Sequence, residues 1–334
     1  MSSVAGAPSQ FDATHAVVTL VRPGLERMER SLAELAASDD PVLGPMLATV
    51  LPGSGKRMRP ALALLVGRLG QDVAADALNH MAVGVELLHT ASLVHDDVVD
   101  ESDTRRGAAT LFTRIGNALA VLVGDYLFSQ AAQECVSTGD LRVVRLFAQT
   151  LGAMAQGQID EANSQLAGSR AWQTMTREDY FRTIRGKTAS LFVLACEGTG
   201  LLAGLRNDQA LALRAYGENL GLAFQVVDDI LDFTSTEAAL GKPVGSDLRQ
   251  GTITLPVILV RDGGLADGRY MTAFETDDVD EQVRLVQSSG AIEAAYKEAN
   301  ALVGNALRAL EALPQGVERQ ALEGLAVYVT QRGH

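Results

Sequence analysis

The sequence predicts an all-α protein, built as one large bundle of helices. Apolar residues recur at steps of three and four from about Val17 onward, which is the spacing of amphipathic helices. Segments that alternate apolar and polar residues, as a half-buried strand would, are scarce. The chain has 334 residues, 47% of them hydrophobic, and is long enough to bury a large core. No repeat or linker divides it, so we expect residues 1–334 to form a single domain.

The expected helices follow one another with short polar breaks. Residues 1–14 are expected to form a mobile arm, and the first amphipathic helix covers about Val17–Leu35. Pro60 suits the first turn of the next helix. Five further helices are expected over about Met81–Asp100, Leu119–Cys135, Leu141–Asn163, Arg177–Gly200 and Asn207–Asp232. After a glycine-rich loop Pro256 begins another helix, and the acidic segment 263–280 is either a surface excursion or a small peripheral helix.

Composition limits the partners and the compartment. The formal net charge of -13 argues against nucleic acid, because phosphate backbones are bound by a surplus of Lys and Arg. Cys135 and Cys196 lie in apolar runs without metal-ligand spacing, which is typical of core cysteines in a reducing cytoplasm. The N-terminus lacks the pattern of a signal peptide. The longest apolar run, Ala189–Leu205, is interrupted by Glu197 and falls short of a bilayer span. We therefore expect a cytoplasmic protein without stable membrane insertion.

Two clusters of aspartates interrupt apolar helical segments. In VHDDVVDES the residues Asp96, Asp97 and Asp100 stand at i, i+1 and i+4, and QVVDDILDF repeats this spacing. The second cluster consists of Asp228, Asp229 and Asp232. Like charges one turn apart destabilise a helix, and carboxylates among large apolar residues are costly to desolvate unless a cation compensates them. Such oxygen ligands are typical of magnesium, which is held by a few carboxylates together with substrate phosphates.

Other interpretations of the clusters are open at this point. Each could be a solvated acidic helix end, although two of them, about 130 residues apart and both in apolar helices, disfavour that interpretation. A di-iron bundle would need pairs of Glu-x-x-His, and the sequence offers only Glu86 with His89. A non-enzymatic acidic scaffold or partner subunit would need neither the six aspartates nor the basic residues that accompany them.

Basic residues accompany both clusters. They are Lys56, Arg57 and Arg59 in the turn PGSGKRMRP, Arg105 and Arg106 after the first cluster, Lys187 beside Thr188, and Lys242 after the second cluster. Arg matches phosphate oxygens with parallel hydrogen bonds and Lys supplies a point charge, although each group alone is a common solvated face. Neither Gly-Lys pair belongs to a P-loop, because Val50 and Phe181 stand where that motif requires glycine.

These motifs together resemble the trans-isoprenyl diphosphate synthase family. GSGKRMRP is similar to the family's GGKRxRP turn, and ELLHTASLVHDDVVDESDTRRG resembles its first aspartate-rich motif. The segment FQVVDDILDFTSTEAALGKPVGSDLRQGTITLP matches its second. The matches run in order from about Gly53 to Pro256. The resemblance implies an isoprenoid synthase-type bundle of about ten or more helices around a deep central cavity, and a homodimer.

The resemblance implies a role for each matched residue. The diphosphate of isopentenyl diphosphate would be bound by Lys56, Arg59, His89 and Arg106. Three Mg²⁺ ions, with Mn²⁺ as an alternative, would be held on an allylic diphosphate by Asp96, Asp97, Asp100, Asp228, Asp229 and Asp232. That diphosphate would also contact Arg105, Lys187, Gln225 and Lys242. The residues expected to be catalytic are Asp96, Asp97, Asp100, Asp228, Asp229, Lys187 and Arg105.

The implied reaction is coherent with this set of charges. Metals and cations would stabilise the negative charge that develops on the leaving diphosphate. Thr188 and Gln225 would offer oxygens towards the allylic carbocation, which needs an apolar cavity free of water. The double bond of isopentenyl diphosphate would then attack, and the departed diphosphate would take the proton. One departure is Thr252, at a position where short-chain members often have Lys.

Product length is expected to depend on the residues before the first cluster. Short-chain members often place a large aromatic residue five positions before the first aspartate, about 7.5 Å along the helix. This sequence has Ala91 and Ser92 there, with Leu88 one turn deeper, and Tyr126 and Phe128 on the next helix as candidate floors. We therefore predict a product beyond fifteen carbons, first a quinone side-chain precursor and second geranylgeranyl diphosphate. A class I terpene cyclase is a third alternative, which the Asp-rich second cluster disfavours.

Overall fold

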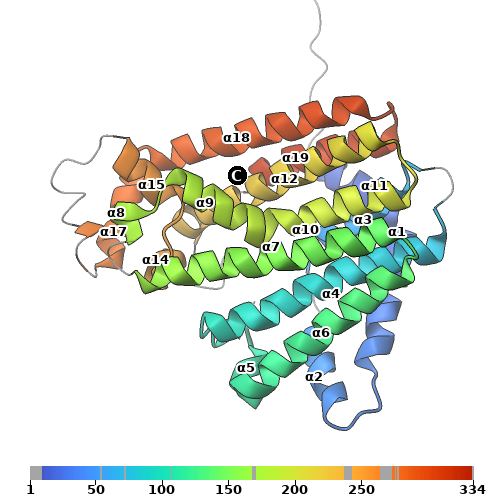
Figure 1. Cartoon of the computed structure of the whole chain (residues 1–334). Helices are drawn as coiled ribbons and strands as arrows, with labels where there is room; N and C mark the ends of the chain where they lie inside the picture. The colour runs from blue at the N-terminus through green and yellow to red at the C-terminus, as the bar shows by residue number, and fades with distance from the viewer. Residues whose placement is uncertain are drawn as a thin grey trace, which may run out of the picture.

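The computed structural model describes residues 10–52, 55–70, 73–105, 107–167, 171–236, 243–263, 273–274, 276 and 278–332. The predicted all-α class is confirmed (Figure 1), and within these residues the strands are limited to one two-stranded hairpin. The first half contains α1 (Gln10–Ala36), α2 (Leu43–Val50), α3 (Met58–Gly67), α4 (Ala75–Val99), β1 (Thr104–Arg105), β2 (Ala108–Ala109), α5 (Leu111–Ile115), α6 (Asn117–Ser137) and α7 (Leu141–Leu166).

The second half begins with a rod of short helical pieces and continues into long helices. The short helix α8 (Ala171–Thr174) precedes the rod, which consists of α9 (Arg177–Ile184), the π-helix η2 (Arg185–Ala189), α10 (Ser190–Val193), the π-helix η3 (Leu194–Gly198) and α11 (Thr199–Leu202). The rod is followed by α12 (Asn207–Thr234), α14 (Ser246–Arg249), α15 (Leu255–Asp262), α17 (Val279–Ser288), α18 (Ala291–Ala309), the 3₁₀-helix η4 (Leu310–Ala312) and α19 (Val317–Gln331).

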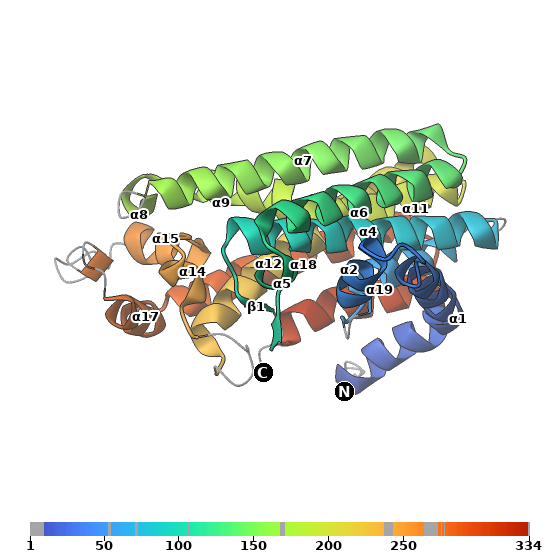
Figure 2. The ribbon, with the colours of Figure 1, turned by 90° about the horizontal axis from the view of Figure 1, so that it is seen from below.

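Helix α12 lies inside the bundle. It packs against α18 on one side and against η2, α10 and η3 on the other, while α7 lies along the outside of η2 (Figure 1). Seen from below, α6 lies beside α4, and α1 and α19 lie on the side of the bundle away from α7 (Figure 2). Tyr216 and Phe192 are among the largest fully buried side chains, and the Tyr216 hydroxyl donates to the Leu322 carbonyl at 2.8 Å. The core therefore joins helices that are far apart in the sequence.

The segment predicted as one helix over Arg177–Gly200 is one rod with two π-helical segments. It begins with a capping box, in which Thr176 Oγ1 accepts from the Asp179 N–H and the Asp179 carboxylate accepts from the Thr176 N–H, both at 3.1 Å. π-Helical segments are rare and are often found at functional sites. The first one, η2, carries Lys187 and Thr188 and turns them towards the bundle interior.

Some boundaries differ from the sequence prediction. α1 begins at Gln10, so the last five residues of the expected arm are helical, while residues 1–9 lie outside the described part of the chain. α4 begins at Ala75, six residues before the predicted start, because its first turns lie at the surface and carry no apolar pattern. Most of segment 263–280 lies outside the described residues. Among the helices described, none combines the length and the apolar character needed to cross a membrane.

Candidate active site

Two cavities meet inside the bundle. The first has a volume of about 580 Å³ and the second about 530 Å³. Seven residues line both cavities: Leu93, Asp96, Arg105, Lys187, Thr188, Gln225 and Asp228. The structure therefore brings together an aspartate from each predicted cluster and two of the predicted cations at the junction of the cavities.

The first aspartate cluster lies at the C-terminal end of α4. Asp96 and Asp100 line the first cavity, and burial raises the pKa of both carboxyl groups. Asp97 is 6% exposed, and its Oδ1 accepts a hydrogen bond of 2.6 Å from Arg105 Nε. Carboxylates at a helix C-terminus also face the negative end of the helix dipole. Cations must therefore compensate this cluster, and Asp97 orients one of them.

The second cluster lies in the last turns of α12, and its three members differ in their partners. Asp228 lines both cavities, whereas Asp232 is 1% exposed and its Oδ2 accepts from the Asp247 N–H at 3.1 Å. Asp229 is 3% exposed and accepts from the Tyr180 hydroxyl at 2.6 Å and from Gln225 Nε2 at 2.8 Å. Burial and the charge of Asp247 raise the pKa of Asp229, and these two donors oppose that shift.

The donor set fits a divalent metal that is shared with a substrate. No group of three or more His, Cys, Asp or Glu side chains in the described residues converges on one metal position. Instead, each cluster presents carboxylate oxygens towards the first cavity, and the buried Oδ1 of Asp100 has no hydrogen-bond partner. Magnesium is often bound by one or two carboxylates, with waters and substrate phosphates completing its octahedron. The clusters therefore suit Mg²⁺ bound together with a diphosphate better than a cage made by protein alone.

Lys187 on η2 lies between the clusters. It forms an ion pair with Glu161 on α7. Although burial lowers the pKa of Lys187, the charges of Glu161 and Asp96 outweigh it, and the net pKa is raised. The ammonium group is therefore charged at neutral pH. Glu161 was not predicted as a site residue, because it stands outside the matched motifs on a helix rich in polar residues.

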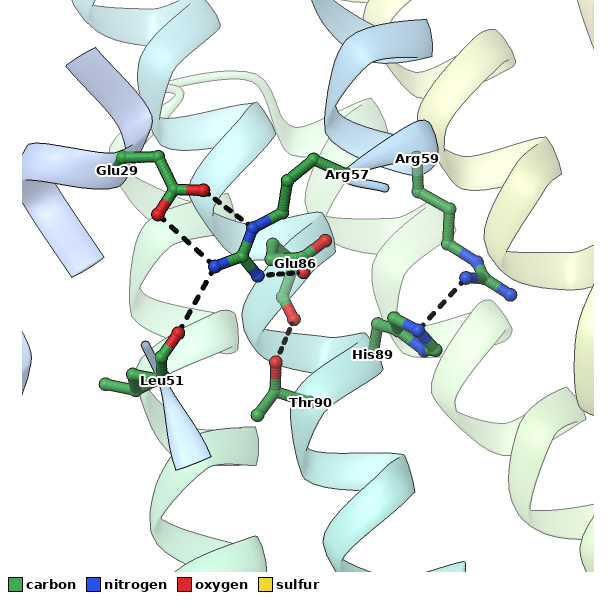
Figure 3. Close-up of polar contacts among 7 residues, drawn as sticks. All are labelled: Glu29, Leu51, Arg57, Arg59, Glu86, His89 and Thr90. Carbon is green, nitrogen blue, oxygen red and sulfur yellow. Dashed lines mark hydrogen bonds and ion pairs between the residues drawn. The ribbon is translucent and has the colours of Figure 1, made fainter. Parts of the chain in front are cut away.

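The second cavity is lined by Arg57, which precedes α3, and by Arg59 in the first turn of α3, and Figure 3 shows them reaching in different directions. Arg57 donates to Glu29 at 2.7 Å and to the Leu51 carbonyl at 3.2 Å, and it also forms an ion pair with Glu86. These contacts hold Arg57 at φ 45°, a left-handed conformation that costs about 1–3 kcal/mol in a non-glycine residue. Arg57 therefore holds the turn before α3 in place.

Arg59, in the first turn of α3, brings a buried positive charge to the cavity. Its Nη1 donates to His89 Nε2 at 3.1 Å (Figure 3), and its guanidinium lies 4.7 Å from the centroid of the Phe192 ring. The buried Nε has no hydrogen-bond partner. Burial lowers the pKa of Arg59 to about 10, so it remains a cation at neutral pH. A partly desolvated cation with an unused N–H is suited to an anionic ligand. Lys56, exposed just before α3, lines the cavity as well.

Arg332 was missed by the sequence analysis. It lies just after α19, outside every matched motif, and its side chain is 8% exposed. The Nη2 atom lies 3.1 Å from Asp228 Oδ1, and the guanidinium lies 4.0 Å above the Phe224 ring. The end of the chain therefore supplies a further cation to the second cavity. Tyr180 and Asp247, which line the first cavity, were missed as well.

The remaining predicted residues are only partly placed. Arg106 and Lys242 lie outside the described residues. Thr252 lines the first cavity and accepts from Gln165 at 2.9 Å.

The predicted chain-length residues lie where α4 packs against α6. Ser92 lines the second cavity, whereas Ala91 and Leu88 are fully buried. Gly84 on α4 lies against Cys135 on α6, and His95 on α4 lies against Gly124 on α6, so the two helices run antiparallel. The chain-length residues of both helices lie between these two contacts. On α6 these residues are Tyr126 and Phe128, which are partly buried.

The structure is a helical bundle in which two acidic clusters and several cationic side chains surround joined cavities, an arrangement suited to a metal ion and an anionic ligand bound together. Residues 40–284 match the family model of polyprenyl synthetase, so the chain belongs to that family, as its motifs predicted.

The relatives share both sequence and fold. Heptaprenyl diphosphate synthase component 2 of Geobacillus stearothermophilus is 35% identical over 326 residues, which cover 96% of this chain and 99% of the relative. A solved decaprenyl diphosphate synthase from Rhodobacter capsulatus has a TM-score of 0.86 at 34% identity, covering 96% of this chain and 99% of the other. A polyprenyl synthase from Caulobacter crescentus, solved with calcium and isoprenyl diphosphate, has a TM-score of 0.87 at 32% identity, covering 96% and 98%.

Proposed function

We propose that this protein is a trans-prenyltransferase that condenses isopentenyl diphosphate with an allylic diphosphate to make a polyprenyl diphosphate. The observation that supports this most directly is the junction of the two cavities, where Asp96 and Asp228 meet Lys187 and Arg105. One substrate in each cavity would bring its reacting carbon to this junction. The names of the relatives, which make heptaprenyl and decaprenyl products, support the long-chain branch.

In this proposal the allylic diphosphate lies in the first cavity. Asp96, Asp100 and Asp228 would hold Mg²⁺, with the other three aspartates of the clusters as the remaining predicted ligands. The three ions expected from the resemblance would neutralise charge on the diphosphate and so stabilise its departure. Lys187, kept charged by Glu161, donates hydrogen bonds to the same diphosphate. Arg105, which Asp97 orients, and Gln225 are the other described residues that would contact this diphosphate.

Isopentenyl diphosphate would lie in the second cavity. Arg59 would supply a fixed positive charge, His89 accepts from one side of its guanidinium, and Lys56 would supply a second charge. Leu93 and Leu191 line the cavity and exclude water from the reacting carbons. The predicted contacts of Arg106 and Lys242 remain part of this proposal.

Incubation with isopentenyl diphosphate, Mg²⁺ and each allylic primer, followed by mass spectrometry of the products, tests the function. We expect diphosphate release and a product longer than fifteen carbons, with a quinone side-chain precursor as the first candidate. A product of twenty carbons would instead establish the geranylgeranyl alternative. Release of no diphosphate with any primer would contradict the proposed activity.

We further infer that the chain forms a homodimer and that residues 1–334 are one domain. Buried side chains from α1 to α19 form one continuous core cluster, which supports the single domain. Leu122 on α6 is 61% exposed, and Leu119 on the same helix is also exposed, which supports a second copy against α6. Cys135 and Cys196 are buried and unpaired, as expected in the cytoplasm. Light scattering coupled to gel filtration tests the dimer, and a monomeric mass would contradict it.

A further inference from the structure

A chain of three hydrogen bonds connects the rod to α12 beside the first cavity. Thr188 Oγ1 donates to Gln225 Oε1 at 2.7 Å, and Gln225 Nε2 donates to Asp229 Oδ1 at 2.8 Å. The other oxygen of Asp229, Oδ2, accepts from the Tyr180 hydroxyl at 2.6 Å. Tyr180 and Thr188 belong to the same rod. The hydrogen bonds therefore run from Thr188 on η2 to two residues of α12 and back to Tyr180 on α9.

The direction of this chain is determined by Asp229. Its two oxygens accept from two donors, and the donor on Oδ1 is the amide nitrogen of Gln225. A glutamine side chain carries its donor and its acceptor on opposite sides of one plane. When the NH₂ group faces Asp229, the carbonyl oxygen must face Thr188. The Thr188 hydroxyl has a single proton, and that proton is committed to Gln225.

Thr188 lies where the reacting carbons would meet. It is 8% exposed, and it lines both cavities, whereas Tyr180 and Asp229 line only the first. A hydroxyl that donates elsewhere still has two lone pairs. A hydroxyl oxygen with free lone pairs and a committed proton favours a positive charge nearby.

We propose that Asp229, whose other oxygen accepts from Tyr180, is a positioning residue that fixes the direction of this chain, so that the Thr188 hydroxyl presents oxygen lone pairs and no proton to the allylic carbon when the bond to the diphosphate breaks. The electron pair of that C–O bond leaves with the diphosphate, and the positive charge stays on the allylic fragment beside Thr188. The inference rests on the proposed function. It differs from the metal-ligand role that the family resemblance implies for Asp229, because it assigns both oxygens of that carboxylate to protein donors.

The key variant is Asp229→Asn, which preserves shape and reverses polarity. The new amide would accept from Tyr180 through its oxygen and donate to Gln225 through its nitrogen. Gln225 would then present its carbonyl to Asn and its NH₂ group to Thr188, whose own proton would be released into the cavity. Thr188→Val removes the oxygen, and Thr188→Ser is the matched control, since it keeps the hydroxyl.

The experiment compares two inert ligands by calorimetry in the presence of Mg²⁺. One is an allylic S-thiolodiphosphate, which is neutral at the carbon chain and does not ionise. The other is a diphosphate whose chain carries an ammonium nitrogen in place of C3, the allylic carbon that shares the positive charge with C1. We expect Asp229→Asn and Thr188→Val to weaken the ammonium ligand by roughly ten- to a hundredfold, the effect of one hydrogen-bonding contact to a charge. The thiolodiphosphate should bind within about threefold of wild type, a difference well below that of one lost contact. Thr188→Ser should bind both ligands as wild type does.

Equal weakening of both ligands by Asp229→Asn would overturn the inference in favour of a metal or structural role. Unchanged binding of both ligands would also overturn it. Tyr180→Phe is a second control, because the Asp229 carboxylate still accepts from Gln225 Nε2 and the direction is kept. It should hold the ratio of the two affinities within about threefold of wild type. A ratio lowered as far as in Asp229→Asn counts against the inference, because loss of any bond in the chain would then have the same effect. If Asp229→Asn does not fold, Thr188→Val and Thr188→Ser still test the oxygen, and equal ratios in these two variants count against the inference. The proposed function is assessed separately, because wild-type protein either does or does not form a polyprenyl product.

Discussion

The crossing of α7 over η2 offers a sharp test of how the site is positioned. Gly157 on α7 lies against the η2 backbone, and a Cβ added there would lie 2.4 Å from Lys187 N and 2.9 Å from the Thr183 carbonyl oxygen. Gly186 on η2 is equally close to α7, because a Cβ added there would lie 2.7 Å from the Ala153 carbonyl oxygen. All these neighbours are backbone atoms, which cannot rotate aside. The two glycines therefore permit the close approach that places Lys187 and Thr188.

We predict that Gly157→Ala separates α7 from η2 and displaces the residues that face the cavities. Ordinary contacts of a Cβ begin at 3.4 Å, so the overlap with Lys187 N requires a shift of about 1 Å. A misplacement of that size costs on the order of 100-fold in rate, or about 2.7 kcal/mol of transition-state stabilisation. Initial rates with saturating and limiting allylic diphosphate should show the loss mainly in kcat.

Gly152→Ala is the matched control on the same helix. No atom lies within 4 Å of a Cβ at that position, so the change should leave kcat unaltered. It should also stabilise α7 by up to about 1 kcal/mol through helix propensity. Wild-type kcat in Gly157→Ala, with its fold verified by circular dichroism, would refute the reasoning. A loss of the same size in Gly152→Ala would also refute it, because the effect would then be one of the helix rather than of the crossing.

Three further predictions follow from the site and the fold. Ala91→Phe should shorten the product by placing a large side chain where α4 packs against α6, as measured by mass spectrometry of the elongation products. Asp96→Ala and Asp228→Ala should each reduce activity by at least about 100-fold and weaken Mg²⁺-dependent ligand binding, because each removes an oxygen facing the cavity. Asp140→Ala should cost about 1 kcal/mol of unfolding free energy, measured with urea, since Asp140 Oδ1 accepts the Arg142 N–H at 2.8 Å and caps α7.

Each of these has an outcome that would contradict it. An unchanged product distribution in Ala91→Phe would exclude this stretch of α4 as the floor of the cavity. Full Mg²⁺-dependent activity in either aspartate variant would exclude that residue as a ligand. The hydrogen bonds from Arg142 lower the pKa of Asp140. The cap is therefore complete above the unfolded-state pKa and is lost as the pH falls through the folded-state pKa, so an acid-independent effect would contradict the capping role.

Much of the fold was predictable because its information is local. Apolar spacing located α4, α6, α7 and α12 to within a few residues, except at the surface-exposed start of α4. The π-helical segments were not predictable, because they depend on the packing of the rod between α7 and α12. The aspartate clusters could be identified for the same local reason, since their spacing and apolar neighbours are both read along the chain.

The sequence by itself determined the family, the helical class and the residue types expected to meet metal and diphosphate. Only the tertiary structure decided which member of each cluster faces the cavity. Asp96 and Asp97 are neighbours in the chain but point about 100° apart around α4, so one lines the cavities and the other holds Arg105. Tyr180, Glu161 and Arg332 are ordinary polar residues in the sequence. They enter the site because helices distant in the chain cross there, and no local pattern records such a crossing.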